Sequence, residues 1–216
     1  MQNKKLLIIT GPQGSGNHLF SRMLSLHPTV KGWDALHTKY WVPSDEEPFS
    51  KFWISPDSLT ADVFDGSKYF LANVSCPFFD NGVMQVPKIS EVANKAKSFG
   101  IDVTVGIIVR DQSINKYQHH RLLGYSTLDI AHDYYCTELL QFNTHFIDFE
   151  AFFLYKQQYL KWLSNVLNFP IAYDDPDILK FIDIDSNKKY VIPVESHWLD
   201  TEIKKGRLPK DHENRN

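Results

Sequence analysis

Short apolar runs recur along the chain at positions that suit buried strands. Residues 5–10 contain LLIIT, and residues 101–111 read IDVTVGIIVRD, so both stretches carry long apolar runs. A strand with apolar residues on both faces is typical of a parallel sheet that is covered by helices on both sides. The pattern predicts strands over residues 5–10, 69–76, 101–111 and 145–149.

Segments with helical spacing alternate with these runs. In GNHLFSRMLSLH, residues 16–27, the apolar positions recur three or four residues apart, at Leu19, Phe20, Met23 and Leu24. Similar reasoning predicts helices over residues 16–27, 87–99, 113–123, about 126–141 and 150–168. Because strands alternate with helices, we expect an α/β protein with a three-layer α/β/α arrangement and a mostly parallel sheet.

The remaining segments lack a clear period. Residues 31–66 mix aromatic, acidic, serine and proline residues, which predicts long loops with short helices. After residue 170 the pattern weakens, and we expect a small hairpin followed by a lid or a disordered end. The length of 216 residues fits one domain over residues 1–216, with a flexible tail over about 205–216.

Charge and hydropathy exclude several classes of protein. The net charge is −3 and the pI is near 6.3, so no global positive field attracts nucleic acid, and a general nucleic-acid binder is not expected. The charged start MQNKK precedes an apolar run that is too short for a signal core or a membrane span. We therefore expect a cytoplasmic protein without a membrane span.

Cysteine and histidine positions give no metal-binding motif. Cys76 and Cys136 fit no CxxC spacing, and we expect two buried free thiols in a reducing compartment. His37, His119 and His120 are expected at the surface, because nothing pairs them as metal ligands. No metal cofactor is expected.

A glycine-rich turn, GPQGSGNH over residues 11–18, follows the first predicted strand. Gly11 and Gly16 have the spacing of the nucleotide P-loop, whose backbone N–H groups and following helix bind phosphate. Asn17 stands where that motif has a lysine, and His18 replaces the hydroxyl that binds magnesium. Hydrolysis of ATP or GTP is therefore disfavoured, and a turn used only for strand–helix packing is the alternative.

Three segments resemble the P-loop sulfotransferases, especially the tyrosylprotein and bacterial types. GPQGSGNHLFSRMLSLHPTVKGWD, residues 11–34, matches the family's G-x-P-R-S-G-T-T-L loop, the helix that ends in A-H-P and a following acidic residue. IIVRDQSINKYQ is similar to the family's second signature, an apolar strand that ends in R-D-P or R-N-P. HFIDFEAFFLYKQQYLKWLSNVLNFP is similar to its later strand and helix.

The resemblance implies a sulfotransferase that uses 3′-phosphoadenosine 5′-phosphosulfate and no metal. Arg110, with Gln118 at the position of the family's serine, would hold the 3′-phosphate of this donor. Asp34 matches the catalytic glutamate and would be the base, provided that burial beside Trp33 raises its pKa; an exposed loop aspartate is the alternative. The 5′-phosphosulfate would be held by backbone N–H groups of Gly14, Ser15, Gly16, Asn17 and His18.

The sequence departs from the family pattern at several positions. Gly14 stands where the family has a lysine or arginine that assists the leaving phosphate. His18 could supply this help as a second catalytic residue. A basic tail could also supply positive charge to the leaving phosphate, and the candidate residues there are Lys204, Lys205 and Arg207. The alternative is a tail that is simply solvated. Ser75 lies near the position where the cytosolic branch of the family has a catalytic histidine, so that branch's mechanism does not transfer. Asp111 is an alternative, purely structural partner for Arg110.

The acceptor remains open between a small molecule, a carbohydrate and a peptide. An aromatic stretch is expected to line its site, because aromatic faces suit sugars and phenols; its members are Trp33, Tyr40, Trp41, Phe49, Phe52 and Trp53. Two other interpretations stand beside the transferase. Loss of the positive side chains favours a catalytically inactive nucleotide-binding relative, and the loop spacing alone allows a nucleotide kinase.

Overall fold

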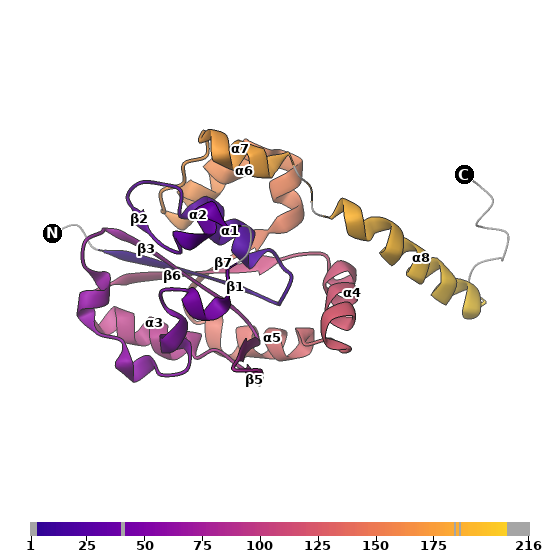
Figure 1. The fold of residues 1–216 in the computed structure, drawn as a ribbon, viewed down its shortest axis with the longest axis horizontal. Coiled ribbons are helices and arrows are strands. Elements are labelled where there is room, and N and C mark those ends of the chain that lie inside the picture. The colour runs from indigo at the N-terminus through magenta and orange to yellow at the C-terminus, as the bar shows by residue number, and fades with distance from the viewer. Residues whose placement is uncertain (1–3, 40–41, 184, 186, 207–216) are drawn as a thin grey trace.

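A computed structural model of the chain describes residues 4–39, 42–183, 185 and 187–206 (Figure 1). Within these residues, the central sheet has five strands in the order β2-β3-β1-β6-β7, and all of its pairings are parallel. The strands are β1 (Lys5–Gly11), β2 (Val30–Lys31), β3 (Tyr69–Ser75), β6 (Asp102–Val109) and β7 (Asn143–Asp148).

Helices cover both faces of this sheet (Figure 1). One face carries α1 (Asn17–Leu24), α2 (Ala35–Thr38), α6 (Phe149–Leu167) and α7 (Pro176–Ile182). The other carries α3 (Ile89–Ser98) and α5 (Leu128–Tyr134), and a π-helical turn, Tyr135–Leu139, continues α5. The predicted three-layer α/β/α arrangement with a parallel sheet is confirmed.

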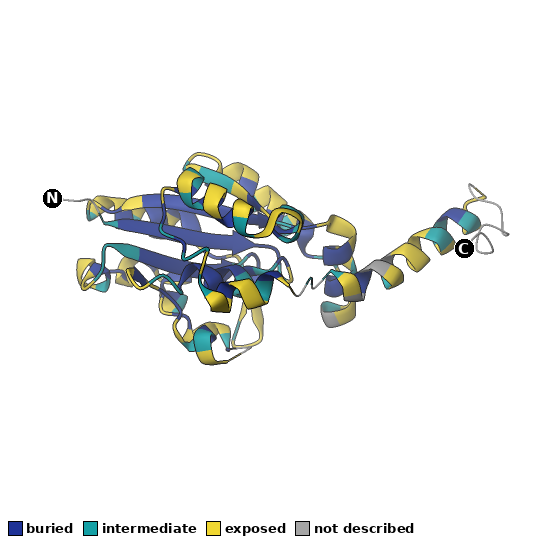
Figure 2. Ribbon diagram, turned by 90° about the horizontal axis from the view of Figure 1, so that it is seen from above, coloured by how far each residue is buried: buried dark blue, intermediate teal, exposed yellow. Residues whose placement is uncertain are grey.

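The alternation of side chains along β1 divides the core into two halves. Leu7 and Ile9 pack with residues of α1 and α6 in one buried cluster, whereas Leu6 and Ile8 pack with residues of α3 in the other. The central strands are therefore buried along their length, as Figure 2 shows. This double burial is the physical reason for the consecutive apolar residues in the strand sequences.

The aperiodic stretch folds as predicted into short helices joined by loops. After α2, four 3₁₀ turns follow, namely Ser44–Glu46, Ser50–Trp53, Pro56–Ser58 and Ala61–Phe64. Their aromatic side chains are not loosely exposed, because Phe52, Trp53 and Phe64 pack in the same cluster as Leu6 and Ile8. An antiparallel pair, β4 (Phe78–Asp80) and β5 (Val83–Gln85), lies beyond the end of β3.

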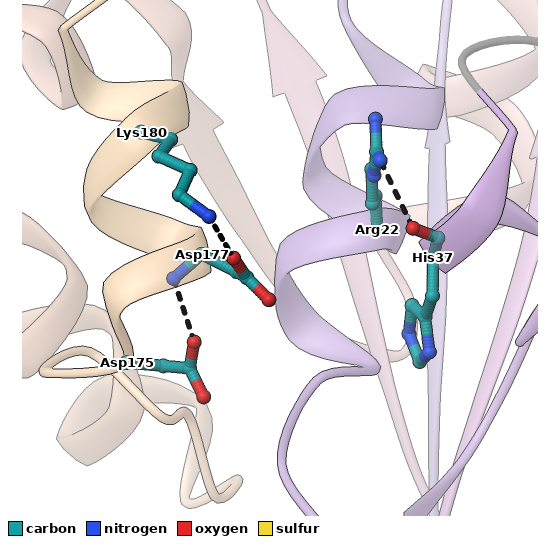
Figure 3. A network of polar contacts seen from close by, with 5 residues as sticks. All are labelled: Arg22, His37, Asp175, Asp177 and Lys180. Atoms are coloured by element: carbon teal, nitrogen blue, oxygen red, sulfur yellow. Dashed lines mark hydrogen bonds and ion pairs between the residues drawn. The ribbon is translucent and has the colours of Figure 1, made fainter.

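The hairpin predicted after residue 170 is wrong, since this region is helical. Pro176 begins α7, and Asp175 caps it by accepting the N–H of Asp177 at 2.8 Å (Figure 3). On the opposite side of Figure 3, Arg22 of α1 donates to the carbonyl of His37. The Arg22 guanidinium also lies 4.5 Å from the ring centre of Phe181, which joins α7 to α1.

The C-terminal part of the chain contains one more helix, α8 (Lys188–Lys204). Its start lies near α4 (Gln112–Leu123), and the rest projects away from the sheet (Figure 1). The flexible tail predicted for 205–216 lies outside the described residues from position 207 onward. None of the described helices is both long enough and apolar enough to cross a membrane.

Two expectations about single side chains are also wrong. Cys76 is buried, but Cys136 is exposed on the π-helical turn. His119, on α4, is buried rather than at the surface, because its ring contacts the Gln13 carbonyl of the glycine-rich turn.

Candidate functional site

The glycine-rich turn lies at the carboxyl end of β1, between β3 and β6. Gly14 and Gly16 have φ values of 77° and 108°, a backbone conformation that other residues rarely adopt. Gly16 begins α1 without a side-chain cap, and the first intrahelical bond runs from the N–H of Phe20 to the Gly16 carbonyl. The N–H groups of Asn17 and His18 therefore precede the helical hydrogen-bond ladder, as anion binding requires. The N–H of Ser15 instead donates to the Pro12 carbonyl at 3.1 Å.

Asn17, at the position of the P-loop lysine, forms hydrogen bonds that link parts of the turn to one another and to β3. Its Nδ2 donates to the Gly11 carbonyl at 3.1 Å and to the Ser75 hydroxyl at 2.9 Å. Its Oδ1 accepts the hydroxyl of Ser15 at 3.0 Å. The side chain is buried and neutral, so it holds the turn against the end of β3 without adding positive charge.

Arg110 brings a buried cation to the opposite side of the turn. Its Nη1 donates to the Gly14 carbonyl at 2.6 Å, and its guanidinium stacks 4.3 Å above the Phe149 ring centre. Nε and Nη2 both donate to Oδ1 of Asn187, at 2.8 and 2.6 Å. Asp111 does not pair with this cation; it caps α4 by accepting the N–H of Ile114 at 2.9 Å. Burial lowers the pKa of Arg110, and among the described residues no carboxylate forms an ion pair with it.

Gln118 joins Arg110 at the same point of the turn. The end of the Gln118 side chain lies directly against Gly14, where a Cβ atom would meet it, and the positive φ of Gly14 favours glycine at this position. The Gln118 amide is oriented so that its nitrogen and its oxygen both have hydrogen-bond partners. Its nitrogen then donates to the Gly14 carbonyl at 3.1 Å, and its oxygen accepts from Nη1 of Arg110 at 3.3 Å. The two residues that the resemblance assigns to one phosphate therefore lie together.

His119 is a contact that the sequence did not reveal. Its Nδ1 accepts the N–H of Thr127 at 3.2 Å, so its Nε2 carries the proton that is donated to the Gln13 carbonyl at 2.6 Å. Burial lowers the pKa of His119, which favours this neutral form. His119 and Arg110 thus bind two successive carbonyls of the turn, those of Gln13 and Gly14. The spacing of Asn115, Gln118 and His119 on one helical face was the available signal.

A cavity of about 640 Å³ opens on the other side of the turn. Its walls come from the glycine-rich turn, the end of β3, the β4–β5 hairpin and residues 44–54, which hold the first two 3₁₀ turns and are called the 3₁₀ segment below. The side chains that matter most for its chemistry are His18, Trp33, Trp53, Ser75 and Phe79. A cavity of this size suits a small organic molecule or one part of a larger one.

His18 lines this cavity, whereas Asp34 does not. The His18 ring lies 5.1 Å from the ring of Trp33, and burial lowers its pKa below the usual value. A neutral imidazole at neutral pH can accept a proton. Asp34 is exposed at the start of α2, so the burial that a base role would require is absent. Of the two predicted catalytic residues, His18 therefore lies at the cavity, whereas Asp34 lies outside its lining.

Glu47 is a buried acid that the sequence analysis missed. Its Oε2 accepts the N–H of Phe49 at 2.9 Å and the indole Nε1–H of Trp53 at 3.2 Å, and its Oε1 accepts the N–H of Asn73 at 3.1 Å. Burial raises its pKa to about 8. This carboxyl group joins the 3₁₀ segment to β3 and thereby fixes one wall of the cavity. In the sequence Glu47 is the last of three consecutive acids, Asp45, Glu46 and Glu47, of which the other two are exposed, so nothing in the sequence singled it out.

The remaining candidate groups lie apart from the turn. Lys204 and Lys205 end α8, which projects away from the sheet, and Lys205 pairs with Glu202 at 3.2 Å (Figure 1). Arg207 lies outside the described residues. In the part of the chain that the structure describes, no cluster of three or more metal-ligating side chains occurs.

Comparison with known proteins adds no relative. No protein-family model matches the chain, and no curated protein matches it at a significant level.

Replacing Asn17 tests whether its hydrogen bonds stabilise the turn. We expect Asn17→Ala to lower the free energy of unfolding by about 1–3 kcal/mol, because the buried Ser15 hydroxyl loses its acceptor and Ser75 loses its donor. Urea denaturation measures this loss. The exposed Asn94→Ala is the matched control, with an expected change within about 0.5 kcal/mol. Equal stability of the two variants would contradict the assignment.

The raised pKa of Glu47 predicts a specific pH dependence of stability. Between the ordinary glutamate pKa of 4.5 and the folded-state pKa of about 8, the folded state keeps a proton that the unfolded state has lost. The free energy of unfolding should therefore fall as pH rises across this window, with a slope of up to about 1.4 kcal/mol per pH unit.

Denaturation series at several pH values measure this slope. Glu47→Gln should remove the contribution, even if it lowers stability by a constant amount. Glu46→Gln, which changes the exposed neighbour, should keep the slope of the unmodified protein. The same slope in all three proteins would disprove a raised pKa at Glu47.

Proposed function

We propose that this protein is a sulfotransferase that moves a sulfuryl group from 3′-phosphoadenosine 5′-phosphosulfate to a hydroxyl or amine acceptor. The observation that carries the proposal is the position of the turn. It has a buried arginine on one side and, on the other, a neutral histidine beside a cavity of about 640 Å³. Of the segments that resemble the sulfotransferases, residues 11–34 contribute the turn and the cavity-facing His18, and IIVRDQSINKYQ contributes Arg110.

The donor would lie along the turn. Arg110 and Gln118 would hold the 3′-phosphate, and the backbone N–H groups of Gly14, Gly16, Asn17 and His18 would face the 5′-phosphosulfate. Two observations support this arrangement. His119 binds the Gln13 carbonyl, so the N–H of Gly14, on the other side of the same peptide unit, is directed away from His119. The N–H groups of Asn17 and His18 precede the helical hydrogen-bond ladder. Sulfuryl transfer requires no magnesium, so the absence of the P-loop lysine and magnesium-binding hydroxyl does not exclude it.

His18 would act as the general base. An acceptor oxygen or nitrogen in the cavity would form the new bond to sulfur while His18 takes its proton, and the bond from sulfur to the 5′-phosphate oxygen would break. The released 3′-phosphoadenosine 5′-phosphate would keep the electron pair. The partial positive charge at the start of α1 would stabilise that leaving group in place of a cationic side chain at position 14.

Trp33 and Trp53 support an acceptor with a planar or sugar-like face, because both indoles line the cavity. A small molecule, a carbohydrate or the side chain of a peptide fits this description. Phe79 of the β4–β5 hairpin adds a third aromatic side chain to the lining.

A second candidate is a nucleotide-binding relative without transferase activity. The uncharged side chain of Asn17 favours this second candidate, because it stands where the P-loop has a lysine and its amide nitrogen hydrogen-bonds Gly11 and Ser75. This relative would bind the same nucleotide but turn over no acceptor.

Calorimetric titration with 3′-phosphoadenosine 5′-phosphate in EDTA tests the donor site. We expect micromolar binding, and Arg110→Ala should weaken it at least about tenfold through loss of a charge-assisted contact. ATP with magnesium is the comparison ligand. Binding of ATP alone would move the assignment to a nucleotide kinase, and binding of neither ligand would remove the donor site altogether.

The role of His18 predicts a kinetic effect that differs from the binding effect. His18→Ala should lower kcat by about 10²–10⁴-fold while the nucleotide affinity stays unchanged. In the unmodified protein, kcat/KM should fall on the acid side with a midpoint below 6.5, because burial lowers the pKa of His18. Sulfuryl transfer to a panel of phenol and sugar acceptors measures both. The exposed His197→Ala is the control, and equal rates in the two variants would rule out the base role.

A further inference from the structure

Arg110 is a buried cation whose strongest contacts are all neutral. Its side chain is only 9% exposed, yet its three nearest bonds go to the Gly14 carbonyl and to the amide oxygen of Asn187. Nε and Nη2 form the edge of the guanidinium that suits two oxygens of a carboxylate or phosphate. Here a single amide oxygen accepts from both nitrogens.

We propose that Asn187 occupies the position of an anionic oxygen on Arg110, and that the start of α8 is a strap that leaves when a phosphate group binds there. The proposal rests on the proposed donor site and adds its regulation. We define the anchor segment as Asp185 together with residues 187–190. The anchor segment and the 3′-phosphate therefore compete for the same edge of the Arg110 guanidinium.

Charge favours the exchange of Asn187 for a phosphate. An amide oxygen has only a partial negative charge, so it compensates a buried guanidinium less well than a phosphate oxygen does. Glu150, Asp185 and Asp111 contribute weaker, longer-range attraction to Arg110. Asp185 belongs to the anchor segment, where its Oδ1 accepts the N–H of Asn187 at 2.8 Å. Release of the segment therefore removes one of these competing acids together with the amide.

The described contacts of α8 with the body lie at its start. Asn187 donates to Glu150 at 2.9 Å, and in the orientation of Gln118 given above the Tyr190 hydroxyl donates to its amide oxygen at 2.8 Å. The Tyr190 ring lies 5.4 Å from Arg110 and 6.3 Å from the Tyr117 ring.

Beyond Tyr190, the large apolar side chains Ile192 and Trp198 are 73% and 54% exposed. Figures 1 and 2 show this part of α8 projecting from the body. Because Asn187 and Tyr190 both contact the Arg110 and Gln118 pair, a phosphate that takes their place there would release the start of α8.

Substitutions at Asn187 in the full-length protein test the competition in two directions. Asn187→Ala removes the competing oxygen and should tighten binding of 3′-phosphoadenosine 5′-phosphate by about fivefold or more. Asn187→Asp in a Glu150→Gln background, where no second carboxylate faces the new group across the 2.9 Å contact, places a carboxylate on Arg110 and should weaken binding at least about tenfold relative to Glu150→Gln alone. Asn94→Ala and Asn94→Asp, on the exposed face of α3, are the matched controls and should bind like the unmodified protein.

Hydrogen–deuterium exchange along α8 gives a second readout. Exchange of residues 188–204 should increase in Asn187→Ala without ligand, and in the unmodified protein when the nucleotide is added. If both Asn187 variants bind more weakly, Asn187 contacts the ligand and the competition is disproved. If both bind like the unmodified protein, the anchor segment does not control the site, and the inference is equally overturned.

The two proposals fail in different ways in this experiment. If no protein binds the nucleotide, the proposed donor site is wrong and the competition falls with it. If the nucleotide binds with the same affinity to all proteins and exchange in α8 stays unchanged, the donor site stands and only the strap is refuted. Opposite shifts at Asn187, with faster exchange in α8, support both.

Discussion

The direction of the backbone groups in the glycine-rich turn determines the properties of the whole site. Three buried side chains from different elements set it. Asn17 ties the turn to the end of β3, His119 binds the Gln13 carbonyl, and Arg110 binds the Gly14 carbonyl. The positive φ values of Gly14 and Gly16 make this path possible. These hydrogen bonds hold two carbonyls of the turn in place between β1 and α1, and the N–H groups of Asn17 and His18 precede the hydrogen-bond ladder of α1.

The turn also separates two environments of opposite character. On the α4 side lies a buried cation, Arg110, which is compensated by neutral groups. On the other side lies a cavity with aromatic walls and a neutral histidine, His18. A transferase requires this division, because the charged donor and the acceptor approach one reacting atom from different sides. The buried Glu47 contributes by holding the cavity wall in place, and α8 contributes by covering the edge of Arg110.

The sequence predicts the sheet and its covering helices well, because double burial leaves an unmistakable pattern in the strands. It also predicts that Arg110 ends a buried strand and that Gln118 lies beside it. It fails after residue 170, where the capping by Asp175 and Pro176 outweighs a weak alternation of apolar residues. It also cannot reveal which buried polar residues bond to the turn. The contacts of Asn17, His119 and Glu47 join residues between 2 and 106 positions apart, so no local pattern encodes most of them.

The proposed donor site requires that the turn bind a nucleotide anion through its backbone, without the usual lysine. Amide ¹H–¹⁵N chemical shifts during titration with 3′-phosphoadenosine 5′-phosphate report on this binding residue by residue. We expect the largest changes at the backbone amides of Gly14, Gly16, Asn17 and His18, together with the side-chain amide of Asn187. Changes confined to other surfaces, or no changes at saturating nucleotide, would contradict it.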